Sequence, residues 1–448
     1  MRSLNNNTMP GRPPLGFLSG VILSLGTIIL FVGMIYYYSE LLLLHSIFSP
    51  MESKATSLLR NISAANCNNG TQEEKAFEHG NGDLQRAEKC TEKQRDKIQA
   101  QLALKSGSVG VEGCYDSSSW LGSFFTEETD IGSESFIGIS VGCNRGDDAI
   151  QTARMGMMDD EFDAVTYTKA LGSLPAHVAC RNPPEKQANI SYPKRLGEMH
   201  CIEPMPSTFK AIERATTEMS LDRKKFVVTH AAISTASGFV KFPDAKAGEE
   251  TLGIGNCEDG KFNCVDVPMY SLDSYADQFV QGKGPINVLQ IDVEGYDFNV
   301  MFGASSVLDR TLYLEFEHSG AGTWGSLHVQ DAVKLLDGKG FTCYWASDNY
   351  LWRITQCYFD LYDSWKEWSN VVCVHRSNTK LLERMENNFL KTLADPTLEE
   401  KAKFCKMCKG PWGRCVARLT YLIQKYGNTN ATQVKLEIME RGYCINPT

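Results

Sequence analysis

The sequence contains no long basic stretch, and its 45 lysines and arginines are outnumbered by 54 aspartates and glutamates. The resulting formal net charge of −9 argues against nucleic acid as a partner, because nucleic-acid-binding surfaces are built from clustered lysine and arginine. The sequence also lacks a convincing Asp-x-Asp element of the kind that holds a metal and a diphosphate, and no metal site is predicted. The 448 residues leave room for one large domain or two of modest size.

Charged residues are also absent from residues 15–38, where apolar side chains dominate. A run of this length spans a bilayer as a helix, whereas the apolar core of a cleaved signal peptide is shorter and a small-x-small cleavage site follows it. Arg2 and Arg12 precede the run and Glu40 follows it, so the positive-inside rule places residues 1–14 in the cytosol. We therefore predict a type II signal-anchor and a single-pass membrane protein that faces the lumen of the Golgi or the endoplasmic reticulum.

The 15 cysteines are many for a cytosolic protein and indicate an oxidising compartment, with disulfides whose pairing the sequence leaves open. Residues 39–110 are polar and poor in aromatic side chains, which predicts a stem. Four N-glycosylation sequons after the predicted anchor fit the same compartment, and they begin at Asn61, Asn69, Asn189 and Asn430. Residues 377–448 are predicted as a helical tail, in which Cys405 and Cys408 suit zinc or, in an oxidising lumen, disulfides.

Residues 111–376 have the composition of a globular domain in which short apolar strands alternate with helices. The strands are predicted at 136–141, 199–203, 226–233, 286–291, 311–317, 341–345 and 371–375. Such alternation is typical of a doubly wound α/β sheet. Residues 159–198 exceed a usual connection and are predicted to form a surface insertion. Residues 348–369 are rich in aromatic side chains, which either pack as a lid over the sheet edge or stack on sugar rings.

A glycine-containing loop follows the first predicted strand and precedes a predicted helix. Gly142 permits a tight turn in this loop, and Gly146 allows a backbone to approach a ligand closely. Glu203 ends the second predicted strand, where an acid can accept hydrogen bonds from the ribose hydroxyls of a nucleotide. The alternative for Glu203 is a solvent-exposed loop acid.

The stretch 286–304 is the most informative part of the predicted domain. A buried strand is followed by Asp292 and Glu294, the chain then turns at Gly295, and a helix begins. Ligands of open α/β sheets bind outside the carboxyl ends of the strands, so both carboxylates are expected at the mouth of a site. Alternatively, the two acids cap the helix and interact with its dipole.

Together these elements resemble the FkbM family of S-adenosylmethionine-dependent methyltransferases. The motifs that carry the resemblance are Ser140-Val-Gly-Cys-Asn-Arg-Gly146, Ile202-Glu-Pro-Met-Pro206, Val228-Thr-His-Ala-Ala-Ile-Ser234, Tyr270-Ser-Leu-Asp273, Gln290-Ile-Asp-Val-Glu-Gly-Tyr296 and Leu314-Glu-Phe-Glu317. The resemblance covers residues 136–375, and the Ile-Asp-Val-Glu-Gly element is its most specific part. The family's glycine loop usually opens with aspartate, whereas this chain has Ser140. The residue at this position is expected to make one polar contact to the amino-acid end of the cofactor.

The resemblance implies a Rossmann-like class I methyltransferase sheet that is mostly parallel, with an antiparallel last strand. It also implies S-adenosylmethionine as the cofactor, bound across the strand tips. The glycine loop is expected to face its methionine part, and the next two strands its ribose and adenine. The cofactor-binding residues implied in this way are Ser140, Gly142, Asn144, Gly146, Glu203, His230 and Ala231.

Methyl transfer to a hydroxyl needs an in-line acceptor oxygen and a base for its proton. Asp292 is the first candidate for this base. Glu294 either acts as a base as well or stabilises the turn. His318 is either a further candidate or a strand-end histidine whose ring is hydrogen-bonded by its neighbours. We therefore expect an O-methyltransferase of the secretory pathway that acts on a glycan or another hydroxyl-bearing molecule. The alternatives are a luminal type II glycosyltransferase and a non-catalytic glycan-binding ectodomain.

Overall fold

The computed structural model describes most of the region between residues 87 and 395. The described residues are 87–104, 120–127, 135–172, 194–257, 260–347, 349–358, 363, 366 and 368–395. The predicted signal-anchor at 15–38, the four sequons and the cysteines of the tail lie outside them. Within these ranges, no helix combines the length and the apolar character that a membrane span requires.

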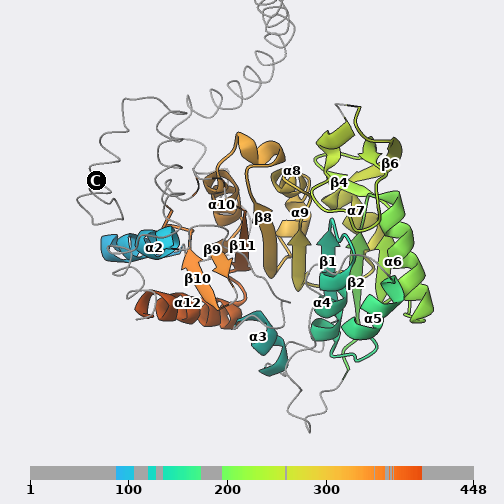
Figure 1. Cartoon of the computed structure of the whole chain (residues 1–448). Helices are drawn as coiled ribbons and strands as arrows, with labels where there is room; N and C mark the ends of the chain where they lie inside the picture. Colours follow the sequence, from blue (N-terminus) through green and yellow to red (C-terminus); the bar gives the residue numbers. More distant parts are fainter. Residues whose placement is uncertain are drawn as a thin grey trace, which may run out of the picture. The chain divides into compact units, whose positions relative to one another are not determined.

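An eight-stranded sheet forms the centre of the described structure, in the order β10-β9-β11-β8-β7-β1-β2-β3 (Figure 1). Its strands are β1 (Phe136–Val141), β2 (Gly197–Ile202), β3 (Phe226–Thr229), β7 (Val288–Ile291), β8 (Tyr313–His318), β9 (Phe341–Ser347), β10 (Tyr350–Arg353) and β11 (Ser369–His375). The strands from β8 to β3 pair in parallel, whereas β11 pairs antiparallel with both β8 and β9. The predicted α/β fold with a mostly parallel sheet and an antiparallel last strand is confirmed, and it fits a methyltransferase.

The core of this sheet is apolar on both faces. Every residue of β1 and of β7 is buried, and Ile139, Leu289 and Leu314 expose none of their surface. Branched and apolar side chains at nearly every position suit a strand that is covered from both sides. The flanking helices are α2 (Glu92–Leu104), α3 (Leu121–Glu127), α4 (Asp147–Met157), α5 (Ala164–Leu171), α6 (Pro206–Glu218), α7 (Leu272–Phe279), α8 (Asp297–Phe302), α9 (Ser305–Leu308), α10 (Val329–Gly338) and α12 (Thr379–Ala394).

A second sheet has three strands in the order β4-β6-β5. It consists of β4 (Ala232–Ser234), β5 (Gly238–Pro243) and β6 (Cys264–Ser271). A buried cluster of Met205, Phe242 and Val267 packs this small sheet against the turn that follows β2. The small sheet therefore lies next to the carboxyl ends of the main strands, where it can contribute to a site.

The prediction of one continuous strand over 226–233 is wrong, because the chain leaves the main sheet after β3 and joins β6 through β4. His230 occupies the break between the two strands. Its ring stacks on Phe209 with centroids 4.9 Å apart, and its Nε2 donates a hydrogen bond of 3.0 Å to the Pro204 carbonyl. These contacts fix the bend, and no local pattern in the sequence shows them.

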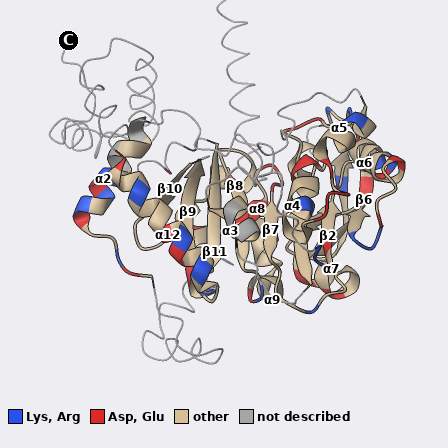
Figure 2. Cartoon of the chain, turned by 90° about the horizontal axis from the view of Figure 1, so that it is seen from below, with Lys and Arg blue, Asp and Glu red and all other residues tan. Residues whose placement is uncertain are grey.

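Helices α2 and α12 pack beside strand β10 at the outer edge of the main sheet. The fully buried Trp352 of β10 donates from Nε1 to Oε1 of Gln101 on α2 at 3.0 Å, and the Gln101 amide donates to the Thr392 carbonyl on α12 at 3.0 Å. Both helices carry charges of the two signs on their surfaces (Figure 2). The folded unit therefore extends on both sides of 111–376, and Trp352 packs in the core.

Part of the segment 159–198 also belongs to the core. Tyr167 on α5 is completely buried, and its hydroxyl donates a hydrogen bond of 2.8 Å to the Arg145 carbonyl beside the glycine loop. Residues 159–172 are thus an integral helical connection, and the rest of the segment up to residue 193 lies outside the described residues.

The described residues contain four disulfides, which confirms the disulfide prediction for this part of the chain. The pairs are Cys90–Cys357, Cys143–Cys201, Cys257–Cys264 and Cys343–Cys373. The Cys90–Cys357 disulfide joins the residues before α2 to the segment after β10, with a sequence separation of 267 residues. The Cys257–Cys264 disulfide closes a short loop, with a sequence separation of 7 residues.

Replacing Cys90 and Cys357 together with serine is expected to lower the free energy of unfolding by about 2–4 kcal/mol, because the cross-link restricts a long loop of the unfolded chain. Denaturant unfolding under non-reducing conditions measures the change. The matched control replaces Cys257 and Cys264 with serine and is expected to lose less, since their loop is short. Equal losses in the two variants would contradict a role of the first disulfide in tying α2 to the sheet.

Candidate active site

The carboxyl ends of four neighbouring parallel strands meet in one row. Val141 of β1 pairs with Ile202 of β2 and with Ile291 of β7, and Ile291 pairs in turn with Phe316 of β8. The residues that come next in these strands are Glu203, Gly142, Asp292 and Glu317, in that order across the sheet. This row is the edge of an open α/β sheet at which ligands bind.

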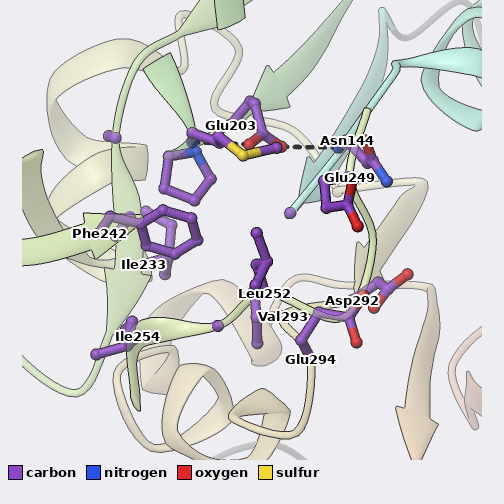
Figure 3. Close-up of a pocket in the computed structure, with 16 residues that line it drawn as sticks. Asn144, Glu203, Ile233, Phe242, Glu249, Leu252, Ile254, Asp292, Val293 and Glu294 are labelled. Carbon is purple, nitrogen blue, oxygen red and sulfur yellow. Dashed lines mark hydrogen bonds between the residues drawn. The ribbon is translucent and has the colours of Figure 1, made fainter. Parts of the chain in front are cut away.

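A cavity of about 610 Å³, part of it open to solvent, lies at this edge (Figure 3). Its lining includes four carboxylates, on Glu203, Glu249, Asp292 and Glu294, and none of its lining residues is lysine, arginine or histidine. The rest of the lining is largely apolar and comprises Gly142, Asn144, Pro204, Met205, Ala231, Ala232, Ile233, Phe242, Leu252, Gly253, Ile254 and Val293. The lining is therefore acidic and suits a ligand that carries positive charge and apolar surface.

Six of the ten predicted site residues line this cavity: Gly142, Asn144, Glu203, Ala231, Asp292 and Glu294. The other four do not. Ser140 is buried within β1, and Gly146 begins α4, where an added Cβ would lie 2.5 Å from the Tyr167 hydroxyl. Gly146 thus serves helix packing. The side chain of His230 faces Phe209 and the Pro204 carbonyl as described above.

His318, the third predicted catalytic residue, lies in the core and is not brought into the cavity. It is 1% exposed, and its Nε2 lies 3.1 Å from Oδ1 of Asp363. Burial alone would raise the pKa of Asp363, but hydrogen bonding and charge from His318 and a hydrogen bond from Tyr358 lower that pKa below its ordinary value. Burial lowers the pKa of His318 itself, so this histidine packs in the core beside Asp363, as in the structural alternative that its strand-end position left open.

The glycine loop is pressed against the end of β7. Gly142 has φ +74°, and a Cβ at this position would lie 1.8 Å from the carbonyl oxygen of Asp292. Only glycine fits this contact, since a side chain would meet rigid backbone and a strained conformation. The disulfide between Cys143 and Cys201 ties the same loop to β2 on its other side.

Glu203 fastens the glycine loop through its carboxylate. Its Oε2 accepts a hydrogen bond from the Asn144 backbone N–H and its Oε1 one from the Met205 N–H, each at 2.8 Å. Burial raises the pKa of Glu203 to about 7, although these two hydrogen bonds lower it. Each carboxylate oxygen keeps one further lone pair, so Glu203 can still accept hydrogen bonds from two neighbouring ligand hydroxyls.

Asp292 projects freely at the cavity mouth. Its side chain is exposed, and within the described residues no hydrogen bond reaches its carboxyl oxygens. Desolvation by the surrounding protein raises its pKa well above the ordinary value, and repulsion from the carboxylates of Glu317 and Glu294 raises it further. A carboxylate with a raised pKa is a stronger base, as proton abstraction from a hydroxyl requires.

Glu294 holds the turn and one wall of the cavity. It adopts φ +54°, and its Oε1 accepts a hydrogen bond of 2.8 Å from the Thr251 backbone N–H. Desolvation raises its pKa, the Thr251 hydrogen bond lowers it, and Glu250 raises it. This geometry favours the second of the two predicted roles, in which Glu294 locks the turn.

Several residues of the site were not singled out from the sequence. Glu249, Leu252 and Ile254 come from the loop between β5 and β6, which is distant in sequence from the strand ends of the main sheet. Glu317 ends β8 as Glu203 ends β2, and this repetition of an acid at a strand tip was a signal in the sequence. Within the described residues, no group of three or more His, Cys, Asp or Glu side chains is arranged to hold a metal ion.

The variant Gly142→Ala is expected to destabilise the protein by more than about 2 kcal/mol and to weaken ligand binding, because its methyl group collides with the Asp292 carbonyl. The control Gly338→Ala places a methyl group at the end of α10 with no atom within 4 Å, and we expect little change. Thermal unfolding of both variants measures the difference. Similar stabilities would show that the loop relaxes away from β7.

Comparison with known proteins agrees with this geometry. A family model of the methyltransferase FkbM domain matches residues 140–342, a range that contains every residue lining the cavity. The comparisons with curated proteins and with solved structures gave no significant match. The match to the FkbM domain supports this family for the matched part of the chain, and with it a methyltransferase.

Proposed function

We propose that the protein is an S-adenosylmethionine-dependent O-methyltransferase with a Rossmann-like class I domain. One observation carries the proposal: the glycine loop, Glu203 and Asp292 line a single cavity at the carboxyl ends of parallel strands, inside the region that matches the FkbM domain. The four carboxylates of the lining suit the cofactor, whose sulfonium is positively charged.

In the proposed arrangement the glycine loop, through Gly142 and Asn144, faces the methionine part of the cofactor. Glu203 accepts hydrogen bonds from the ribose hydroxyls, and the backbone at Ala231 flanks the adenine together with the apolar side chain of Ile233. All five residues line the cavity. When bound, the cofactor supplies an electrophilic methyl group.

Asp292 is the proposed base. Its carboxyl is exposed at the cavity mouth, so an acceptor hydroxyl can approach it while Asp292 orients the acceptor oxygen and takes its proton. The apolar side chains of Phe242, Leu252 and Ile254 exclude water from the opposite wall. Exclusion of water protects the methyl group from hydrolysis and strengthens the electrostatic contacts of the carboxylates.

For the acceptor we propose a hydroxyl group of a glycan or another molecule of the secretory pathway. The support is the apolar run at 15–38, the four sequons and the disulfides among the described residues, which form in an oxidising lumen. A type II anchor in the Golgi or the endoplasmic reticulum is part of the same proposal.

Calorimetry on the purified protein tests the cofactor. Binding of S-adenosylmethionine is expected, and Glu203→Gln should weaken it about 10–100-fold, because one carboxylate oxygen that accepts hydrogen bonds becomes an amide donor. Glu218→Gln, an exposed position at the end of α6, is the matched control and should bind like the wild type.

Heat with a nucleotide sugar but none with S-adenosylmethionine would replace the methyltransferase proposal with the glycosyltransferase alternative. Incubation with a labelled methyl donor and a panel of glycans then identifies the acceptor. Cofactor binding without label transfer to any hydroxyl acceptor would favour a non-catalytic ectodomain.

A further inference from the structure

Glu317 stands beside Asp292 at the tip of the neighbouring strand. Because Ile291 and Phe316 are paired in the parallel register of β7 and β8, the residues that follow them, Asp292 and Glu317, occupy adjacent positions. Side chains at matched positions of parallel strands point to the same face of a sheet. The carboxyls of these two residues therefore approach each other across the strand tips.

A tryptophan from a third strand anchors Glu317. Trp368 directly precedes β11, which runs antiparallel to β8, and its Nε1 donates a hydrogen bond of 2.6 Å to Oε1 of Glu317. This contact fixes one carboxyl oxygen of Glu317, whose charge acts on Asp292. Glu317 does not line the cavity itself, so any effect on a ligand passes through Asp292.

We propose that Glu317 is a positioning residue that orients the Asp292 carboxyl toward the acceptor and shares one proton with it, so that the two strand tips work as one base. The inference rests on the proposed methyl transfer. It adds a second carboxyl, with its tryptophan anchor, to a site in which Asp292 alone faces the acceptor.

The surroundings of the pair are acidic. Desolvation, together with repulsion from Asp297, Glu294 and Glu250, raises the pKa of Glu317 to about 8, although the Trp368 hydrogen bond lowers it. Besides Glu317 and Glu294, the carboxylates that act on Asp292 are Asp297 on α8 and Asp148 on α4. Two neighbouring carboxyls in such a setting cannot both ionise easily, so one proton remains between them near neutral pH.

The pair acts in a balanced step. The acceptor O–H bond breaks, and its proton moves to the ionised carboxylate of the pair while the oxygen forms a bond with the methyl carbon. The carbon–sulfur bond breaks, and its electron pair neutralises the sulfonium as a thioether. The pair then releases the proton to solvent through the exposed side of Asp292.

The test measures binding of S-adenosylmethionine and S-adenosylhomocysteine to the full chain between about pH 5 and 9. Only S-adenosylmethionine carries the positive sulfonium, so an ionised carboxylate beside the sulfur tightens its binding and not that of S-adenosylhomocysteine. The Kd of S-adenosylhomocysteine divided by that of S-adenosylmethionine should therefore rise with pH. In Glu317→Gln the midpoint of this rise should fall by about one pH unit, because Asp292 loses a negative neighbour. Glutamine still accepts the Trp368 hydrogen bond, which preserves the anchor.

Two further variants separate positioning from a merely structural role. Trp368→Phe removes the donor that stabilises ionised Glu317, so Glu317 carries less negative charge and the midpoint should also fall, by less than in Glu317→Gln. Asp266→Asn, an exposed carboxylate of the small sheet paired with Lys241, should leave it unchanged. Absence of S-adenosylmethionine binding to the wild type would overturn the proposed function. Binding with an unmoved midpoint in Glu317→Gln, or an upward shift in Trp368→Phe, would overturn the inference alone.

Discussion

The close contact between the glycine loop and the end of β7 is the constraint on which the site depends. The backbone of Gly142 passes so near the Asp292 carbonyl that no Cβ fits between them. The contact follows from the parallel register of β1 and β7, in which the Asp292 N–H donates to the Val141 carbonyl at 2.9 Å. The loop that would face the cofactor and the acid that would face the acceptor are therefore held at one distance by backbone alone.

The same register concentrates negative charge. Glu203, Asp292 and Glu317 lie at the ends of β2, β7 and β8, and desolvation raises the pKa of each. Repulsion from nearby carboxylates raises the pKa of Asp292 and of Glu317 further. Such crowding destabilises the empty site when these carboxyls ionise, because their pKa values in the folded chain exceed those in the unfolded chain. Their contribution to stability therefore declines as the pH rises from the ordinary carboxyl pKa toward 7 and 8. A bound cation would offset this repulsion, which is one reason for proposing a sulfonium ligand.

Much of this arrangement is visible in the sequence. The apolar strands and the acids at their tips predicted the parallel sheet and the location of Glu203 and Asp292, since both follow from local patterns. The small sheet, the break at His230 and the pairing of His318 with Asp363 depend on contacts between distant segments, which local patterns do not contain. The roles of α2 and α12 were missed for the same reason, because they become evident only through the buried Gln101 between Trp352 and Thr392.

The two walls of the cavity differ in how they are held. The glycine loop is fixed by the contact with β7, by the Glu203 carboxylate on the Asn144 N–H and by the disulfide of Cys143. A second wall, residues 249–254, is attached to the turn after β7 by the hydrogen bond from Thr251 to Glu294. Preorganised contacts suit a ligand that never changes, such as a cofactor, because they need no rearrangement on binding. Leu252 and Ile254 of the second wall also pack against the cluster of Met205, Phe242 and Val267, so this wall too is held in place before any ligand binds.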